Sequence, residues 1–322
     1  MIKKQNLTIG TNITKSITFP NYFNSWIRTY KGAKLAYATL HRYQVTQKVI
    51  QHEFAGVNIK LINRQQYQKF INKLGVTHAP SSVTKANVLI RAVVNSAISD
   101  DYLTKNFTKE VSIVANPAKT IKVGYLNLDE IHRLIETTSS KKITSRRYTS
   151  RYMILTAIYT GMRLSEIQGL TWNDIDFIHA TTNINKSWDA INHCFKPTKN
   201  ESSIRKIKIN RKLVQVLKRL KVNAPSTMVF INQNGTIPTS NAVNKTLRAI
   251  LSDLKIHRRG FHFHSLRHSH VALLLANGIN LYAISKRLGH SSTATTSKVY
   301  AYLIDEYKDE TDQAIVKALD NL

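Results

Sequence analysis

Two arginines stand in segments whose residue types suit the binding of a phosphate. The first, Arg163, follows Gly161 at the expected start of a helix, and Glu166 lies three residues later on the same helix face. Free backbone N–H groups at a helix start favour an anion, and an arginine there adds a fixed positive charge. Taken alone, an Arg–Glu pair at this spacing is more often a surface ion pair. Both interpretations remain open from this segment by itself.

The second arginine, Arg267, lies in a segment that holds four histidines between residues 262 and 270. His264 and Arg267 share one helix face, and an imidazole beside a guanidinium can hold a phosphate and handle a proton. His264 and His268 are one turn apart, which is also a spacing of metal ligands. No cysteine or carboxylate is close in sequence, and Arg267 would add a positive charge beside the metal. We therefore predict a phosphate clamp and no metal site.

A third segment, Leu-Gly-His-Ser-Ser at residues 288–292, is followed by Tyr300, ten residues after His290. Alone, a tyrosine in a helical tail is usually a half-buried core residue. The sequence contains no G-x-x-x-x-G-K-[ST] phosphate loop, no H-E-x-x-H and no G-x-S-x-G. Their absence argues against ATP-driven chemistry, zinc proteases and serine hydrolases of the nucleophile-elbow type.

The composition points to a polyanionic partner. The 322 residues carry a formal charge of +28, and 42% of them are apolar, which is enough for folded cores. The basic residues run through the whole chain, whereas membrane binders usually concentrate them in a tail or on one helix. Nucleic acid is therefore the first candidate partner. No apolar run approaches the ~18 residues of a membrane span, and the lone cysteine, Cys194, excludes an internal disulfide, so we expect a cytoplasmic protein.

Hydrophobic periodicity predicts a first unit that is wholly helical. Its four helices are expected within residues 19–114, over 19–30, 39–50, 63–74 and 83–98. Residues 115–125 contain Pro117 and Gly124 and have the character of a linker.

A second unit begins at Asn127, three residues before Glu130, which is the spacing of a capping box. Its predicted helices cover residues 128–137, 148–160, 211–221, 239–254, 264–277 and 280–287. Alternating and β-branched residues predict one small three-stranded antiparallel sheet from residues 181–188, 194–198 and 204–209. The fold class is thus mainly α with a small antiparallel sheet, in two domains.

In order and spacing, the three segments around Arg163, Arg267 and His290 resemble the tyrosine recombinase (phage integrase) family, and in particular the integrases of Gram-positive phages and integrative elements. A fourth match is Lys199, in the turn between the last two predicted strands, where the family keeps its catalytic lysine. Lys196 competes for this place, and the Ser-Ser-Ile-Arg register that follows favours Lys199.

The resemblance implies two domains that form a clamp around DNA. Residues 1–18 would be an N-terminal arm, 19–114 a helical, SAM-like core-binding domain, and 115–125 the linker. Residues 126–322 would be the catalytic domain, ending in a tail helix from residue 305. Some integrases carry a further N-terminal domain that binds arm sites, and the stretch before Phe19 is too short to hold it. This is expected either of a truncated form or of a simpler recombinase that lacks arm binding.

The resemblance also implies the chemistry. Tyr300 would attack a DNA phosphodiester and form a 3′-phosphotyrosyl link, while Lys199 protonates the leaving 5′-oxygen. Tyr302 lies two residues further on, but the ten-residue interval from His290 favours Tyr300 as the nucleophile. His264 would be the general base toward the tyrosine hydroxyl.

The remaining motif residues would bind the phosphate. Arg163 and Arg267 would clamp its non-bridging oxygens, His290 would donate a hydrogen bond to it, and Glu166 would orient its neighbours. Two guanidiniums would thus replace the metal ions of other nucleases, so no cofactor, metal or ATP is expected.

The implied partner is a double-stranded DNA recombination site, bound by a homotetramer that assembles through the C-terminal tail. Accessory partners of the family are an excisionase and a DNA-bending host protein, and the place of action would be the nucleoid. Arg42, Lys85 and Arg91, on the predicted helices of the first domain, are the expected DNA contacts, although a solvated helix face explains them equally well.

Three other functions stay open beside an integrase. One is a Xer-like resolvase or invertase of the same chemistry. Another is a DNA-binding protein without catalysis, against which the intact catalytic positions argue. The last is a zinc nuclease.

Overall fold

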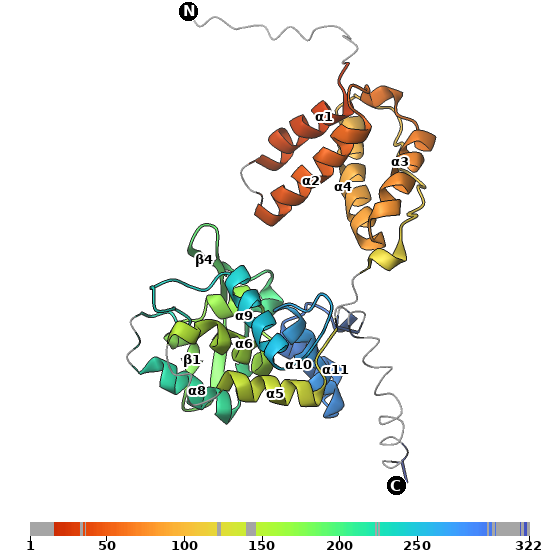
Figure 1. Ribbon diagram of the computed structural model, residues 1–322. Coiled ribbons are helices and arrows are strands. Elements are labelled where there is room, and N and C mark those ends of the chain that lie inside the picture. Colours follow the sequence, from red (N-terminus) through yellow and green to blue (C-terminus); the bar gives the residue numbers. More distant parts are fainter. Residues whose placement is uncertain are drawn as a thin grey trace, which may run out of the picture. The chain divides into compact units, whose positions relative to one another are not determined.

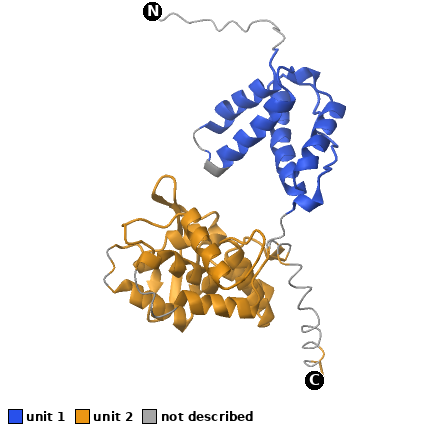
Figure 2. Cartoon of the chain, in the orientation of Figure 1, with its two compact units in different colours: residues 1–121 blue, residues 122–322 orange. Residues whose placement is uncertain are grey.

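The computed structural model describes residues 16–32, 35, 37–120, 124–139, 146–222, 224, 226–294, 296–297, 300, 316 and 319–320. The chain divides into two compact units, residues 1–121 and 122–322, which Figure 2 shows in different colours. The division falls within the predicted linker. Most of the predicted N-terminal arm and of the predicted tail helix lies outside the described residues.

The described residues of unit 1 form four α-helices and short helical turns (Figure 1). They are α1 (Phe19–Trp26), which continues into the π-helical turn η1 (Ile27–Lys31), α2 (Tyr37–Glu53), α3 (Arg64–Thr77) and α4 (Pro80–Ser99). Two of these helices have an N-terminal cap formed by the polar residue that precedes the helix. The Thr18 hydroxyl accepts from the N–H of Asn21, and Asn63 forms a reciprocal capping box with Gln66. The four predicted helices are present, and the last three differ by up to three residues at their ends.

Aromatic rings dominate the core of unit 1. The ring of Phe19 meets those of Phe54 and Phe107 at 5.6 and 5.8 Å, and Phe54 meets Phe70 at 5.3 Å. Edge-on pairs of this kind add about 0.5–1.5 kcal/mol each beyond the area they bury. The helices of unit 1 are thus joined by a core of their own.

Unit 2 is built around α6 (Thr149–Thr160), which packs against five other helices of the unit and is buried along nearly its whole length. A helix that is apolar on every side is expected at the centre of a domain. The surrounding helices are α5 (Leu128–Ser139), α7 (Leu164–Gln168), α8 (Arg211–Lys221), α9 (Ser240–Asp253), α10 (Ser265–Ala276) and α11 (Leu281–Leu288). Among the helices described in the two units, none is both long enough and apolar enough to cross a membrane.

The predicted small antiparallel sheet is present, but its membership differs from the prediction. One sheet has three strands in the order β1 (Ile175–Asp176), β2 (Thr181–Ile184) and β5 (Arg205–Lys208). A separate two-stranded hairpin joins β3 (Lys186–Asp189) to β4 (Cys194–Pro197). The strand predicted over residues 181–188 therefore breaks at Asn185, and its two halves join different sheets.

Contacts outside the sheets explain this break. Lys186, the first residue of β3, forms an ion pair with the buried carboxylate of Asp174. A Cβ on Gly169 would lie 3.1 Å from the backbone of Ser187, so α7 and the residue after it pack closely against β3. These partners are distant in sequence, so the alternation of residue types over 181–188 gave no sign of the break.

Candidate active site

The chain makes a sharp turn between α6 and α7, and this turn places Arg163. Gly161 ends α6 with a left-handed φ of +65°. A Cβ at this residue would lie 2.6 Å from Cδ2 of His270 and 2.9 Å from Cδ2 of Leu288, so glycine is required for space as well as for φ. Arg163 becomes the N-terminal flanking residue of α7, with its side chain one-quarter exposed.

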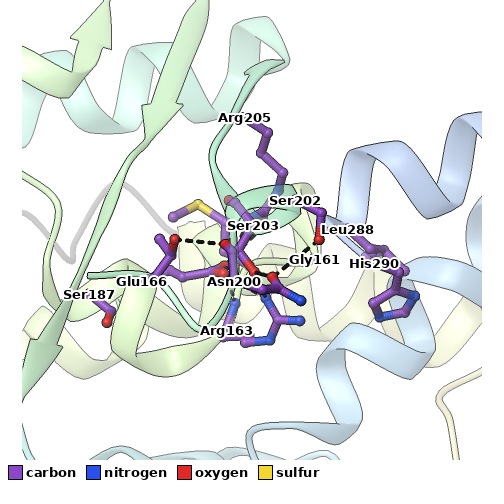
Figure 3. Close-up of polar contacts among 12 residues, drawn as sticks. Gly161, Arg163, Glu166, Ser187, Asn200, Ser202, Ser203, Arg205, Leu288 and His290 are labelled. Atoms are coloured by element: carbon purple, nitrogen blue, oxygen red, sulfur yellow. Dashed lines mark hydrogen bonds and ion pairs between the residues drawn. The ribbon is translucent and has the colours of Figure 1, made fainter. Parts of the chain in front are cut away.

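Glu166 is a buried carboxylate held between two arginines (Figure 3). Arg163 Nη1 donates to Glu166 Oε1 at 2.8 Å, and Arg205 Nη2 donates to Oε2 at 2.9 Å. Burial alone would raise the pKa of Glu166, but the hydrogen bonds and charge of Arg205, and then those of Arg163, hold it below its ordinary value. The Arg–Glu pair predicted from sequence is thus part of a buried triad, not a surface ion pair.

Arg205 was not predicted as a site residue, and it organises the turn that carries the predicted lysine. Its Nε donates to the carbonyl of Arg287 at 2.7 Å, and its Nη1 donates to the carbonyl of Ser203 at 2.8 Å. The Ser203 hydroxyl donates to Asn200 Oδ1 and accepts from Arg163 Nη1 at 3.4 Å. The turn between β4 and β5 is therefore tied to Arg163.

Arg267 is 2% exposed and is held by protein carbonyls. Its Nη1 donates to the carbonyl of Gly161 and its Nη2 to the carbonyl of Leu288, both at 2.7 Å. Burial, and then the charge of Arg163, lowers its pKa to about 10, so it stays protonated at neutral pH. The structure thus brings the two predicted phosphate-binding arginines into one cluster.

His290 joins the same cluster as a hydrogen-bond acceptor. Its Nε2 lies 3.0 Å from Nη2 of Arg267, and because a guanidinium only donates, this nitrogen carries no proton. The proton then sits on Nδ1, which donates to the hydroxyl of Thr296 at 2.7 Å. Burial, followed by the charge of Arg267, lowers the pKa of His290 to about 4. The predicted donation from His290 to a phosphate therefore needs a change of tautomer or a proton at Nε2.

Tyr300 is 1% exposed and belongs to a buried cluster with Val271 and Ala272 of α10 and with Ile284 and Leu288 of α11. The imidazole that meets its ring is that of His268, with centroids 5.3 Å apart. His268 in turn meets His264 at 5.5 Å, and within the described part of the chain its buried Nδ1 has no hydrogen-bond partner. Desolvation, and then the charges of His268 and Arg267, lower the pKa of His264, although the residue itself is exposed.

Residues 124–306 match the phage integrase family, and residues 18–75 match the SAM-like N-terminal domain of phage integrases. The chain belongs to the phage integrase family. It is therefore a tyrosine recombinase, an enzyme that cleaves and rejoins DNA.

Curated relatives cover nearly the whole recombinase. The XerC-like tyrosine recombinase of Caldanaerobacter subterraneus subsp. tengcongensis is 26% identical over 334 residues, which cover 93% of this chain and 83% of the relative. The integrase of Staphylococcus phage L54a is 25% identical over 348 residues, covering 98% and 97% of the two chains.

Solved structures share the fold at lower identity. The Tn1549 transposon integrase in complex with a circular intermediate DNA has a TM-score of 0.76 and 20% identity, covering 93% of this chain and 100% of that one. A lambda integrase tetramer bound to a Holliday junction has a TM-score of 0.66 and 16% identity, with 90% and 82% covered.

The two lysines that compete for the catalytic position differ in their surroundings. Lys199 is exposed in the turn between β4 and β5, next to Asn200. Lys196 lies on β4 and forms an ion pair across the hairpin with Asp189 at 3.5 Å. The recombinase thus leaves Lys199, rather than Lys196, beside the turn that Arg163 contacts. The competing tyrosine, Tyr302, lies outside the described residues.

The cluster adjoins a cationic groove of about 470 Å³ on the side of β5 and α11. Its basic lining residues are Arg205, Lys206, Lys208, Lys286 and Arg287, and the neutral His290 lines it as well. Such a groove suits a run of phosphates. In the described residues there is no group of three or more His, Cys, Asp or Glu side chains that could hold a metal ion.

In unit 1 the predicted DNA contacts separate into two places. Arg42 and Lys85 are exposed and line one pocket of about 260 Å³ between α2, α3 and α4. Arg91 lies elsewhere on α4, where its Nη2 donates to the carbonyl of Thr108 at 3.1 Å. The structure thus joins two of the three predicted contacts and gives the third a partner within unit 1.

Proposed function

We propose that Tyr300 is the nucleophile of site-specific recombination that integrates and excises a phage or mobile element. Its oxygen forms a bond to the scissile phosphorus, the bond from phosphorus to the 5′-oxygen breaks, and a 3′-phosphotyrosyl link remains. The observation that carries the proposal is the convergence of three separate segments. Arg267 donates to the carbonyl of Gly161, two residues before Arg163, and to Nε2 of His290.

The arginines are suited to bind the two non-bridging oxygens of the phosphate. Described partners occupy three of the five N–H groups of Arg267, which leaves two for an anion. Arg163 keeps one-quarter of its side chain exposed. Both guanidiniums are held before DNA arrives, and preorganised donors of this kind stabilise charge that develops in a transition state.

Tyr300 lies on the same cluster. Its ring meets that of His268, the residue after Arg267, with the centroids 5.3 Å apart. The ring is nearly inaccessible, however, and the attack therefore requires Tyr300 to leave the buried cluster that it forms with Leu288 and residues of α10.

The experiment uses a labelled duplex that carries a recombination site, to be found by sequencing the DNA that flanks the gene, with a nick that lets the 5′-product diffuse away. We expect the wild type and Tyr302→Phe to form a covalent DNA adduct, and Tyr300→Phe to form none. A chelator should not change the yield. An adduct with Tyr300→Phe, or none with the wild type, contradicts the proposal.

Lys199 protonates the leaving 5′-oxygen in this proposal, and His264 accepts the tyrosine proton. A substrate with sulfur in place of the 5′-bridging oxygen tests the lysine, because a thiolate leaves without a proton. The cleavage defect of Lys199→Gln should then shrink toward wild type, and Lys196→Gln should cleave both substrates normally. A defect of Lys199→Gln that is equal on both substrates rules out this role.

The DNA and protein partners follow from the same proposal. Residues 19–114 would bind the core site and residues 126–322 would cleave it, joined by the linker at 115–125. The tetramer seen for lambda integrase on a Holliday junction supports a homotetramer here, assembled through residues 305–322. An excisionase and a DNA-bending host protein would act beside it at the nucleoid.

The similarity to a XerC-like tyrosine recombinase favours a second role, that of a Xer-like resolvase or invertase of the same chemistry. Mapping the covalent adducts on the host DNA separates the two roles. Adducts at the ends of the element that carries the gene support integration, and adducts at a single replicon site support resolution.

A further inference from the structure

Arg287 joins four elements of unit 2 at the rear of the cluster. It lies in the last turn of α11, and its Nη2 donates to the carbonyl of Tyr159, at the end of α6, at 3.0 Å. Its Nη1 donates to the carbonyl of Lys208 on β5 at 3.0 Å, and its Nε donates to His270 Nε2 on α10 at 3.1 Å. The helix α6 leads into the turn that places Arg163 and α11 leads into His290, whereas Arg267 lies on α10 itself and β5 begins at Arg205.

His270 is the matching acceptor, and its tautomer is fixed from both sides. The Nδ1 atom lies 2.8 Å from the carbonyl of Ile158, which can only accept, so Nδ1 carries the proton. Nε2 is then free to accept from Arg287. Burial, and then the charge of Arg287, lowers the pKa of His270 to about 3, so the ring is neutral at physiological pH.

The two residues hold the carbonyls that aim Arg267. One carbonyl belongs to Gly161, against which the His270 ring packs so closely that a Cβ there would clash. The other belongs to Leu288, the residue after Arg287. Arg287 ties the end of α6 to the end of α11, and so its contacts fix the separation of these two carbonyls.

We propose that Arg287 and His270 are positioning residues that set the orientation of the Arg267 guanidinium toward the scissile phosphate. The proposal rests on the proposed function of Arg267. Lysine cannot replace Arg287. The three N atoms of the guanidinium each donate to a different acceptor, and the single N atom of an ammonium group cannot reach all three. A displacement of about 1 Å in a catalytic group is enough to cost about 100-fold in rate.

The test compares the single-turnover rate of covalent adduct formation on the nicked duplex, using the full chain. Arg287→Lys should form the adduct about 100-fold more slowly than wild type, with non-covalent binding of the duplex within about twofold. Arg248→Lys, on an exposed arginine of α9, is the matched control and should react at the wild-type rate.

A second substrate separates positioning from a general structural defect. Replacing one non-bridging oxygen of the scissile phosphate by a methyl group removes the charge that a second guanidinium would neutralise. On this substrate the loss of rate relative to wild type should become smaller for both Arg267→Ala and Arg287→Lys. An equal penalty for Arg287→Lys on both substrates overturns the proposal.

If Arg287→Lys does not fold, His270→Asn tests the same positioning role. Its amide can still donate to Ile158 but has no atom that reaches Arg287, so it should show the same loss and the same recovery on the methylated substrate. A wild-type rate with His270→Asn overturns the pairing. Failure of the wild type to form any adduct would instead count against the proposed function, so the two failures are distinguishable.

Discussion

The cations of the two units differ in how they are held. In unit 2, Arg267 is buried against carbonyls and Arg163 is fixed to the buried Glu166. In unit 1, Arg42 and Lys85 are exposed beside apolar side chains. Burying a charge is costly unless it has partners, so the cluster of unit 2 contains its own carboxylate and acceptors. The lesson is that fixed cations suit a reaction at one phosphate, and exposed cations suit binding along many.

The largest effect should come from Arg267→Lys, which keeps the charge but loses the fork. Lysine cannot bridge the carbonyls of Gly161 and Leu288 and still contact a phosphate. We expect adduct formation on the nicked duplex to fall about 1,000-fold, with non-covalent binding unchanged. If Arg267→Lys lost DNA affinity as much as it lost rate, the fixed cations of unit 2 would act in binding just as the exposed cations of unit 1 are expected to act.

Glu166→Gln tests the partner that the buried arginines need. Removing this carboxylate leaves Arg205 without its charge partner in a position that is only 6% exposed. Breaking a buried pair in this way should lower the free energy of unfolding by about 3–5 kcal/mol at pH 7. Because the pKa of Glu166 is lowered on folding, its contribution disappears in acid, and the difference from wild type should narrow below about pH 4.5. Urea unfolding of the wild type and the variant at pH 7 and below about pH 4.5 measures this difference in the free energy of unfolding.

Between about pH 6.5 and 4.5 the histidines should control the stability of unit 2. His270 has a pKa of about 3 when folded and about 6.5 when unfolded, so the unfolded chain takes up a proton that the folded chain does not. Stability is full above pH 6.5, and His270 alone should cost about 2 kcal/mol by pH 5. His264, His268 and His290 act in the same direction.

Urea unfolding of a Trp26→Phe variant, followed by the fluorescence of Trp172 and Trp188, reports this loss for unit 2 alone. Adding His270→Gln should flatten the dependence on pH. A pH-independent midpoint would show that these rings are not held neutral.

The smallest effect belongs to unit 1. Replacing both Arg42 and Lys85 with glutamine should weaken non-covalent DNA binding about tenfold at 0.1 M salt and lower the salt slope by about 1.8, since each phosphate contact contributes about 0.9. Arg91→Gln is the matched control, because Arg91 is engaged by the carbonyl of Thr108. Fluorescence anisotropy over a salt series measures both. An equal loss of DNA affinity with Arg91→Gln would show that a hydrogen bond within unit 1 does not keep an arginine from contacting DNA.

Sequence periodicity located the helices well because each follows a local pattern. The core helix α6 ends where Gly161 was expected to end it, and α8 covers the predicted residues. The sheet was harder to predict, since pairing joins strands that are not neighbours in sequence. β1 has only two residues, too few for an alternation to be visible, and β2 pairs with β5 across the whole β3–β4 hairpin.

The candidate site divides in the same way. The motif residues themselves, with their order and spacing, were visible in the sequence, because a reaction at a phosphate needs particular side chains. Their partners were not. Arg205 appeared only as the last residue of the Ser-Ser-Ile-Arg register that favours Lys199, with no sign of its contact with Glu166, and His268 looked like one member of a histidine run.

The sequence by itself determined which side chains are available for the chemistry and on which elements they lie. The tertiary structure decided their protonation and their pairing. Glu166 meets Arg205 across 39 residues of chain, and Arg267 meets Gly161 across 106. Packing of α6, α10 and α11 creates these contacts, and the burial that comes with it fixes which imidazole nitrogen holds a proton. No local pattern carries that information, because burial depends on residues far away in the chain.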